Sequence, residues 1–170
     1  MDVSETIEKR RSIRKYQTKP VETEKLNKIL QAARLGPSAA NVQPCHFIVV
    51  TKPEARASLR AAYPAEWFLQ APAIIVVCAN PKESWRRKDG EEFWKVDAAI
   101  AMQNLVLTST ELGLGTCWMT NFEEKELKKA LNIPKEIRAV AMTPLGYPAE
   151  EKGPATERKP LNEIVHNEKW

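Results

Sequence analysis

Apolar residues along the chain follow two different helical patterns. In the first, four of them lie on one face at i, i+3, i+4 and i+7: Leu26, Ile29, Leu30 and Ala33. This spacing predicts a helix that begins near residues 20–21 and ends at Gly36-Pro37, a pair typical of a helix C-terminus. In the second pattern, apolar residues between 92 and 112 lie on nearly every side. A helix without a polar face is buried in a core or in an interface.

Other stretches predict strands and shorter helices. The predicted strands are 46–51, 73–79, 116–119 and 137–143. The stretch AIIVVCA at 73–79 is continuously apolar, which is typical of a strand buried on both faces. Further helices are predicted at 54–62 and 123–131, and Ser4 is expected to cap a helix at the N-terminus. Strands separated by helices in this mixed order favour an α/β sandwich of about four or five strands.

The C-terminal part has a different character. Four prolines follow one another at wide spacing: Pro144, Pro148, Pro154 and Pro160. Proline lacks a backbone N–H and is excluded from helix interiors and central strands. We therefore expect an extended tail from Pro144 onward, either disordered or lying across a partner.

Composition narrows the class of protein. The 170 residues are 43% apolar and 28% charged, which excludes a disordered chain and fits one domain spanning 1–170. No apolar run approaches the roughly 20 residues of a membrane-spanning helix. The N-terminus lacks the apolar core of a secretory signal, so we expect a cytoplasmic protein. The net charge of +4 mildly favours anionic ligands, and it fits nucleic acid, a phosphorylated cofactor or no specific ligand equally.

The cysteines and histidines offer little metal chemistry. Cys45, Cys78 and Cys117 are odd in number and widely spaced, and the histidines are His46 and His166. This inventory argues against a disulfide framework and against a zinc site.

Four segments carry candidate chemistry, and none of them supplies a familiar catalytic motif. They are 10–14 (RRSIR), 37–44 (PSAANVQP), 113–122 (GLGTCWMTNF) and 158–161 (RKPL). Arginine suits phosphate oxygens, and small polar loops let a ligand approach the backbone. Taken singly, each segment also fits a solvated charge cluster, a polar connection, or a helix cap followed by a strand. The chain has no Gly-x-Gly-x-x-Gly, Walker or Gly-x-Ser-x-Gly motif, so in an enzyme a cofactor would carry the reaction.

Taken together and in this order, the segments resemble the FMN-dependent nitroreductase family. The resemblance covers essentially the whole chain through RRSIRKY, GPSAANVQPCHFIVV, DAAIAMQNLVLTSTELGLGTCW, PLGYP and RKPL. It implies a homodimeric α+β fold with a mixed, mostly antiparallel sheet flanked by helices and with FMN at the dimer interface. It also implies that the C-terminal arm, about 148–170, crosses to the partner subunit.

The resemblance assigns cofactor-binding roles residue by residue. Arg10 and Arg158 would bind the FMN phosphate, with Arg11 and Lys159 nearby and Ser12 at the same end. Arg14 would face the pyrimidine side of the flavin ring. From the other subunit would come Pro37, Ser38, Ala39, Asn41 and Gln43. Beside the ring would lie Trp118, Met119, Thr120 and Asn121, with a backbone N–H near the flavin N5.

The chain departs from the family pattern in two places. Cys45 stands where the family often has an aromatic residue, and the residues 63–67 do not match the polar segment that contacts flavin in larger members. The substrate pocket is therefore open or lined by Tyr63, Trp67 or Trp85.

The implied activity is an NAD(P)H-dependent oxidoreductase. NADH or NADPH would reduce FMN, and a small-molecule acceptor such as a nitroaromatic or a quinone would then take the electrons in a ping-pong mechanism. No side chain is assigned as catalytic, because FMN carries the chemistry. The alternatives are a flavin-binding protein without rapid turnover, a specialised dehalogenase-like relative and, from the basic charge, a nucleic-acid-binding module. We expect the protein to bind no nucleic acid, no membrane and no metal ion.

Overall fold

The sheet forms the centre of the structure, a computed structural model that describes residues 1–155 and 157–170. These residues form four strands in the order β1-β2-β4-β3, and each neighbouring pair is antiparallel. The strands are β1 (Cys45–Val50), β2 (Ala73–Ala79), β3 (Gly115–Thr116) and β4 (Arg138–Gly146). An isolated parallel bridge joins Ser12 to Thr116 at the β3 edge. The expected α+β fold with a mixed, mostly antiparallel sheet is therefore confirmed.

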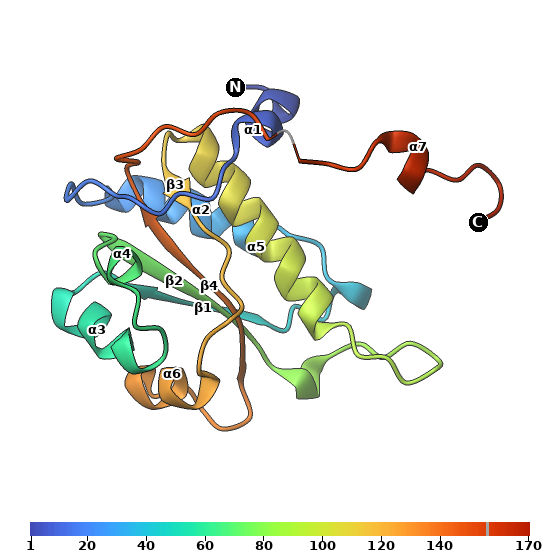
Figure 1. The fold of residues 1–170 in the computed structure, drawn as a ribbon. Helices are drawn as coiled ribbons and strands as arrows, with labels where there is room; N and C mark the ends of the chain where they lie inside the picture. Colours follow the sequence, from blue (N-terminus) through green and yellow to red (C-terminus); the bar gives the residue numbers. More distant parts are fainter. Residues whose placement is uncertain (156) are drawn as a thin grey trace.

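Helices cover both faces of this sheet (Figure 1). The α-helices are α1 (Val3–Lys9), α2 (Thr23–Arg34), α3 (Pro53–Ser58), α4 (Glu66–Leu69), α5 (Trp94–Glu111), α6 (Glu124–Leu131) and α7 (Leu161–Ile164). Short 3₁₀ turns are η1 (Ala39–Asn41), η2 (Leu59–Ala61) and η3 (Pro81–Glu83). Helices α2 and α5 lie on one face, and α3, α4 and α6 lie on the other.

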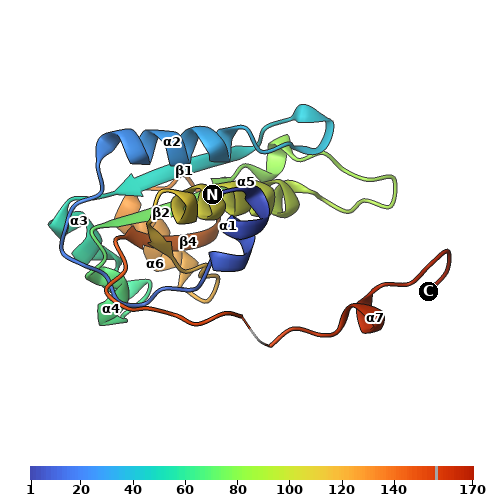
Figure 2. The same cartoon turned by 90° about the horizontal axis from the view of Figure 1, so that it is seen from above.

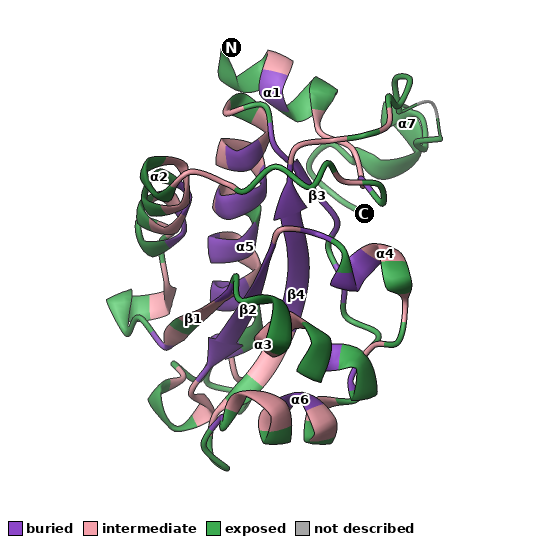
Figure 3. Ribbon diagram, turned by 90° about the vertical axis from the view of Figure 1, so that its left-hand side faces the viewer, coloured by how far each residue is buried: buried purple, intermediate pink, exposed green. Residues whose placement is uncertain are grey.

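Strand β2 belongs to both apolar cores. Ile75 and Val77 pack in the cluster with α2 and α5, whereas Ile74 and Val76 pack in the cluster with α4 and α6. Side chains of a strand alternate between its faces, so a strand covered on both faces needs apolar residues at every position. All seven residues of β2 are buried, as Figure 3 shows for the centre of the molecule. The expectation of a doubly buried strand at 73–79 is confirmed.

Helix α5 runs along the sheet and is the longest helix of the described residues (Figures 1 and 2). Met102 and Leu105 are fully buried against the sheet, whereas Val96 is 46% exposed on the opposite side. The end of α2 approaches α5 closely at Gly36, where an added Cβ would lie 3.2 Å from the Cα of Ala101. Packing within this chain therefore accounts for only part of the apolar surface of α5, because Val96 stays exposed to solvent.

Several element boundaries differ from the expected ones. Asp2, not Ser4, caps α1, since its Oδ1 accepts the Glu5 N–H at 2.8 Å. The helix expected from residues 20–21 begins at Thr23, and the one expected at 54–62 is divided between α3 and η2. The cap and the start of α2 differ by two or three residues from the expected positions, and helix ends are the least sharply defined part of a helix.

The tail prediction is wrong at its start, because Pro144 lies inside β4, between β2 and β3. In the register of β3 with β4, Thr116 pairs with Leu145 and Met119 with Met142, which places Cys117 opposite Pro144. Proline has no N–H to donate there. The Cys117 N–H instead donates to the Thr143 hydroxyl oxygen at 3.1 Å, and that hydroxyl donates to the Pro144 carbonyl at 2.8 Å.

This substitution of partners explains a second difference. The strand expected at 116–119 is interrupted, so that β3 ends at Thr116 and pairing resumes only at Met119, whose N–H and carbonyl both bond Met142 at 2.9 Å. The central strand tolerates proline because a buried hydroxyl replaces the missing link. Thr143 is fully buried.

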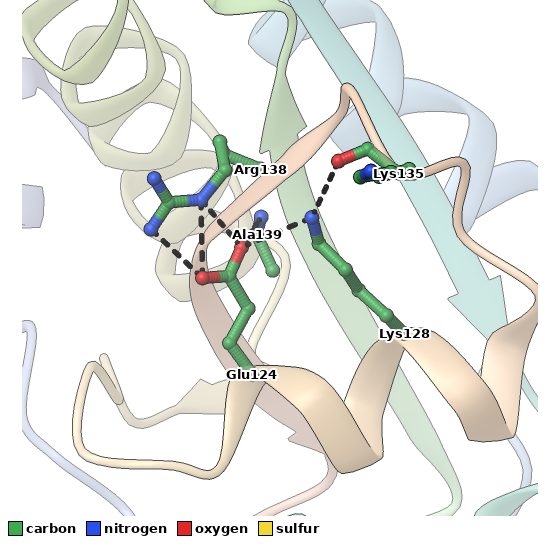
Figure 4. A network of polar contacts seen from close by, with 5 residues as sticks. All are labelled: Glu124, Lys128, Lys135, Arg138 and Ala139. Atoms are coloured by element: carbon green, nitrogen blue, oxygen red, sulfur yellow. Dashed lines mark hydrogen bonds and ion pairs between the residues drawn. The ribbon is translucent and has the colours of Figure 1, made fainter.

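The Glu124 carboxylate joins α6 to the first residues of β4 (Figure 4). Glu124 accepts three hydrogen bonds from Arg138, at 2.8 and 3.1 Å from Nε and at 2.8 Å from Nη2, and one from the Ala139 N–H at 3.0 Å. Lys128 lies 3.7 Å from the same carboxylate. The hydrogen bond from Arg138 is the main cause that lowers the pKa of Glu124 below its ordinary value of 4.5.

We expect Glu124→Gln to lower the free energy of unfolding by about 1–2 kcal/mol at pH 7, because charge-assisted hydrogen bonds are lost. Since the folded pKa is lowered, the carboxylate contributes its stabilisation above pH 4.5, and this contribution disappears as the pH falls through the folded value. The difference between wild type and variant should therefore shrink below pH 4.5 in urea titrations. Glu126→Gln on the same helix is the control, and an equal loss in both variants would contradict this role.

Candidate functional site

The arginine-rich segment at 10–14 lies against the start of the C-terminal arm. The Ile13 N–H donates to the Thr116 carbonyl at 2.8 Å, which adds this segment to the edge of the sheet. On its other side the Arg14 N–H donates to the Glu150 carboxylate at 2.6 Å, and the Ala149 N–H donates to the Lys15 carbonyl at 2.9 Å. The backbone that carries the arginines is therefore held from both sides.

Arg11 and Arg14 have different surroundings. The Arg11 guanidinium donates to three backbone carbonyls, those of Gly153 at 2.6 Å, Glu8 at 2.5 Å and Arg10 at 2.7 Å. It ties the end of α1 to the arm. Arg14 is exposed, and its guanidinium carbon lies 5.8 Å from the centre of the Trp67 ring. Such a distance allows a cation–π contact and leaves the guanidinium donors open to a ligand.

A hollow of about 490 Å³ brings several expected residues together. It is lined by Arg14, Tyr63, Trp67, Cys117, Trp118, Met119, Thr120 and Asn121. Among the lining residues there is one cation and no carboxylate, and the Tyr63 and Trp67 rings meet edge to face with their centres 6.1 Å apart. A cation beside flat aromatic walls suits an electron-rich planar group.

The turn at 118–121 carries backbone N–H groups beside this hollow. The N–H groups of Cys117 and Met119 both bond β4. The Trp118 N–H lies between them in the chain. The Trp118 ring is 37% exposed at the same place.

Tyr63 and Trp67 line this hollow as expected for an aromatic pocket, whereas Trp85 does not. Its ring packs on Phe93 with the centres 5.2 Å apart, in the segment before α5. Ser84 fixes this segment, since its hydroxyl oxygen accepts the N–H groups of Phe93 and Trp94 at 3.0 and 3.1 Å.

The small polar loop at 37–43 has an unusual backbone. Ala40, Asn41 and Gln43 have φ values of +50°, +56° and +51°, a left-handed region that residues other than glycine rarely adopt. Several hydrogen bonds hold the loop, and in two of them a backbone N–H donates to a side-chain oxygen. The Ala39 N–H donates to Oδ1 of Asp97 at 2.9 Å, and the Gln43 N–H donates to the Ser38 hydroxyl oxygen at 3.0 Å.

The expected site residues fall into two groups at opposite ends of α5. The loop at 37–43 shares a hollow of about 450 Å³ with Asp97 and Ala101, near the beginning of the helix. The arginine segment shares another hollow, of about 530 Å³, with Thr110 and Gly113 at its end. Thirteen residues separate Asp97 from Thr110, which is about 20 Å along the helix axis. The chain by itself therefore does not bring the two groups together.

The first residues of the C-terminal arm contact the arginine segment, whereas its last residues do not continue along it. Arg158 and Lys159 are exposed, and Figures 1 and 2 both show residues 157–170 leading away from the sheet. The Arg158 guanidinium donates to the Glu157 carbonyl at 2.7 Å. Arg158 therefore bonds a neighbouring residue of its own arm.

Metal-ligand clusters and membrane-spanning helices are both absent from the part of the chain that the structure describes. Within residues 1–155 and 157–170, no three His, Cys, Asp or Glu side chains gather in a way that could hold a metal ion. In the same part of the chain, every helix is too short or too polar to cross a membrane.

Comparison with known proteins shows which class of protein has this fold and site. A model described as the nitroreductase family matches residues 7–65 and 60–147. A relative from Methanothermobacter thermautotrophicus is 38% identical over 175 residues, covering 100% of this chain and 88% of its own. The chain belongs to the nitroreductase family, so the resemblance drawn from its five motifs is confirmed.

Other relatives carry names that describe activities. A Thermus thermophilus protein named NADH dehydrogenase is 31% identical and is covered over 95% of its length, with 97% of this chain. A nitroreductase family protein from Clostridium difficile 630 has a TM-score of 0.92 and 32% identity, with both chains covered completely. An FMN-dependent nitroreductase from Clostridium difficile R20291 has a TM-score of 0.83 and 33% identity, with 97% of this chain and 98% of its own covered. The expected class, an NAD(P)H-dependent oxidoreductase that uses FMN, agrees with these names.

Three side chains that hold the site were not among the expected residues: Glu150, Asp97 and Thr143. Asp97 carried a usable signal, because a carboxylate in a helix without a polar face needs a partner. Glu150 and Thr143 carried none, since their partners lie 136 and 26 residues away in the chain.

Gly115 allows the arginine segment to approach the sheet. A Cβ at this position would lie 2.8 Å from the Ile13 side chain, which is closer than carbon atoms pack. We expect Gly115→Ala to lower the free energy of unfolding by about 1–3 kcal/mol in urea titrations. Gly153→Ala, where nothing lies within 4 Å of the added Cβ, is the matched control and should change stability little. A Gly115→Ala protein as stable as the control would contradict the close approach.

Proposed function

We propose that the protein is a homodimeric FMN-dependent oxidoreductase that takes electrons from NADH or NADPH. The observation that carries this proposal is the separation of the expected site residues to opposite ends of α5. Residues that serve one ligand from places about 20 Å apart must come from two copies of the chain. A two-fold dimer brings the loop of one subunit to the arginine segment of the other.

Exposed apolar surface supports a partner copy. On α1, Val3 and Ile7 are 71% and 54% exposed, and on the arm, Leu161 and Ile164 are 74% and 55% exposed. Together with Val96 on α5, these side chains are exposed apolar groups at separate places that a second copy would cover. In this arrangement the arm crosses to the partner, where Arg158 and Lys159 reach the phosphate end of its site.

The phosphate end of the cofactor suits the arginine segment. Arg10 and, from the partner's arm, Arg158 supply the planar donors that replace water around a phosphate dianion. Ser12 lies at the same edge of the sheet, beside Thr116. Arg11 contributes by fixing the backbone, because its own donors already bond carbonyls.

The ring end suits the hollow between Arg14 and the turn at 118–121. Bound FMN supplies the two-electron transfer between NAD(P)H and a small acceptor such as a nitroaromatic or a quinone. Arg14 would hold the pyrimidine edge of the ring and stabilise negative charge there, and the Trp118 N–H would be a donor for the ring nitrogen N5. The open hollow admits donor and acceptor in turn, which gives ping-pong kinetics.

The first test is the visible spectrum of the purified protein. We expect yellow protein, or protein that becomes yellow on adding FMN, whose flavin bands bleach with NADH or NADPH under anaerobic conditions and return on adding a quinone. Bands that stay unbleached with both nucleotides would favour a flavin carrier. Protein that takes up no FMN would overturn the proposal.

Arg14→Ala should weaken FMN binding at least tenfold, because the cation facing the ring is lost. Titration of FMN fluorescence measures the effect. Lys15→Ala removes the same charge from the neighbouring position and should stay within about twofold of wild type. Equal affinities of the two variants would contradict the assigned contact.

Subunit mixing tests the shared site. Arg14→Ala and the double variant Asn41→Ala/Gln43→Ala should each have low reductase activity. After exchange of subunits, half of the dimers are hybrids with one intact site, so about a quarter of wild-type activity should return. A chain carrying all three changes, mixed with wild type, forms hybrids with no intact site and is the control. Failure of the first mixture to gain activity over its components would contradict a site built by two subunits.

A further inference from the structure

The loop at 37–43 holds a conformation that its sequence does not favour. Three residues with side chains, Ala40, Asn41 and Gln43, have positive φ values within four positions. Each of them is disfavoured by contact of its Cβ with its own backbone. Such a loop persists only where its surroundings hold it in place. The question is which group supplies that restraint.

Asp97 is the buried group that reaches the loop from α5. Its side chain is on a residue only 3% exposed, and Oδ1 accepts the Ala39 N–H at 2.9 Å. The bond joins the first residue of the η1 turn to a helix that is packed along the sheet. Ser38 adds a bond within the loop, to the Gln43 N–H, but this bond does not connect the loop to the body of the protein.

The second carboxylate oxygen of Asp97 has no hydrogen-bond donor among the described residues. This oxygen, Oδ2, is buried. Asp97 also lines the hollow under the loop, beside Ser38, Gln43 and Cys45. Burial raises the pKa of the Cys45 thiol to about 11, and the charge of Asp97 adds to this effect. A buried carboxylate with one free oxygen is costly, so packing alone does not account for its presence.

We propose that Asp97 is the positioning residue of the cofactor site, which sets the loop so that Asn41 and Gln43 face the flavin bound by the partner subunit. It acts through the Ala39 N–H and touches no substrate. This inference rests on the proposed function for the identity of the ligand, but the restraint on the loop exists without any ligand. The two parts can therefore be measured separately.

Three substitutions separate hydrogen bonding from packing. Asp97→Asn keeps an acceptor oxygen, Asp97→Leu keeps a similar volume without an acceptor, and Asp97→Ala keeps neither. Glu111→Gln, an exposed carboxylate at the other end of α5, is the control. Hydrogen exchange of the amides at 38–43 in cofactor-free protein measures the restraint, and titration with FMN measures the consequence.

We expect the Leu and Ala variants to exchange the loop amides at least tenfold faster and to bind FMN at least tenfold more weakly, while the Asn variant stays within about twofold of wild type. A Leu variant that matches wild type in both measurements would overturn the proposal. Faster exchange with unchanged FMN affinity would also overturn it. In that case Asn41→Ala/Gln43→Ala decides the wider question, because weaker FMN binding there leaves the proposed function standing and unchanged binding removes the loop from it.

Ala39→Pro provides a second route if the Leu and Ala variants do not fold. It removes the N–H donor and leaves Asp97 in place. Proline fits the first position of a helical turn, and Ser38 before it has φ −128° and ψ 152°, the extended conformation that proline requires. Faster exchange at Gln43 with weaker FMN binding supports the proposal. Wild-type values in both measurements would overturn it.

Discussion

The packing of α5 along the sheet determines where the functional parts of the molecule lie. Met102 and Leu105 are fully buried between this helix and the central strands, and the end of α2 closes against it at Gly36. A helix packed in this way cannot tilt without opening the core. The loop at 37–43 is attached near its beginning and the arginine segment near its end. The distance between this loop and the arginine segment is therefore a property of the core, not of the loops.

The arginine segment and the loop at 37–43 are held in place by different kinds of contact. The arginine segment joins the sheet edge through a backbone hydrogen bond and joins the arm through the Glu150 carboxylate, the Arg11 guanidinium and a backbone bond. The loop depends on one buried side chain and on a backbone conformation that costs free energy. The first arrangement is shared among several contacts, whereas the second depends on the identity of Asp97. Family membership is consistent with both, because the motifs that carry the resemblance include each of these segments.

Local sequence signals were sufficient for most of the elements, but not for the partners of their side chains, and the list of cofactor-binding residues rests on the family resemblance. The strand at 73–79 and the helix at 92–112 could be predicted from their nearly unbroken apolar sequence, because burial on both faces of an element requires it. The place of Pro144 in a central strand could not be predicted, since it depends on a threonine hydroxyl that replaces a missing amide across the strand pair. The engagement of Arg11 with Gly153 likewise joins residues 142 positions apart. The assignments of single residues to FMN stay predictions, whereas the fold and the family are confirmed.

Pro144 also bears on how the protein avoids assembling in the wrong way. The edge of a sheet is a template on which the strands of other molecules can add, and long regular edges promote aggregation. At the β3 edge, regular pairing with β4 is limited to two residues because the ladder breaks opposite the proline, and the segment around Ser12 covers Thr116. The chain beyond that point does not present an unbroken row of donors and acceptors. This edge of the sheet is in this way a poor template for another strand.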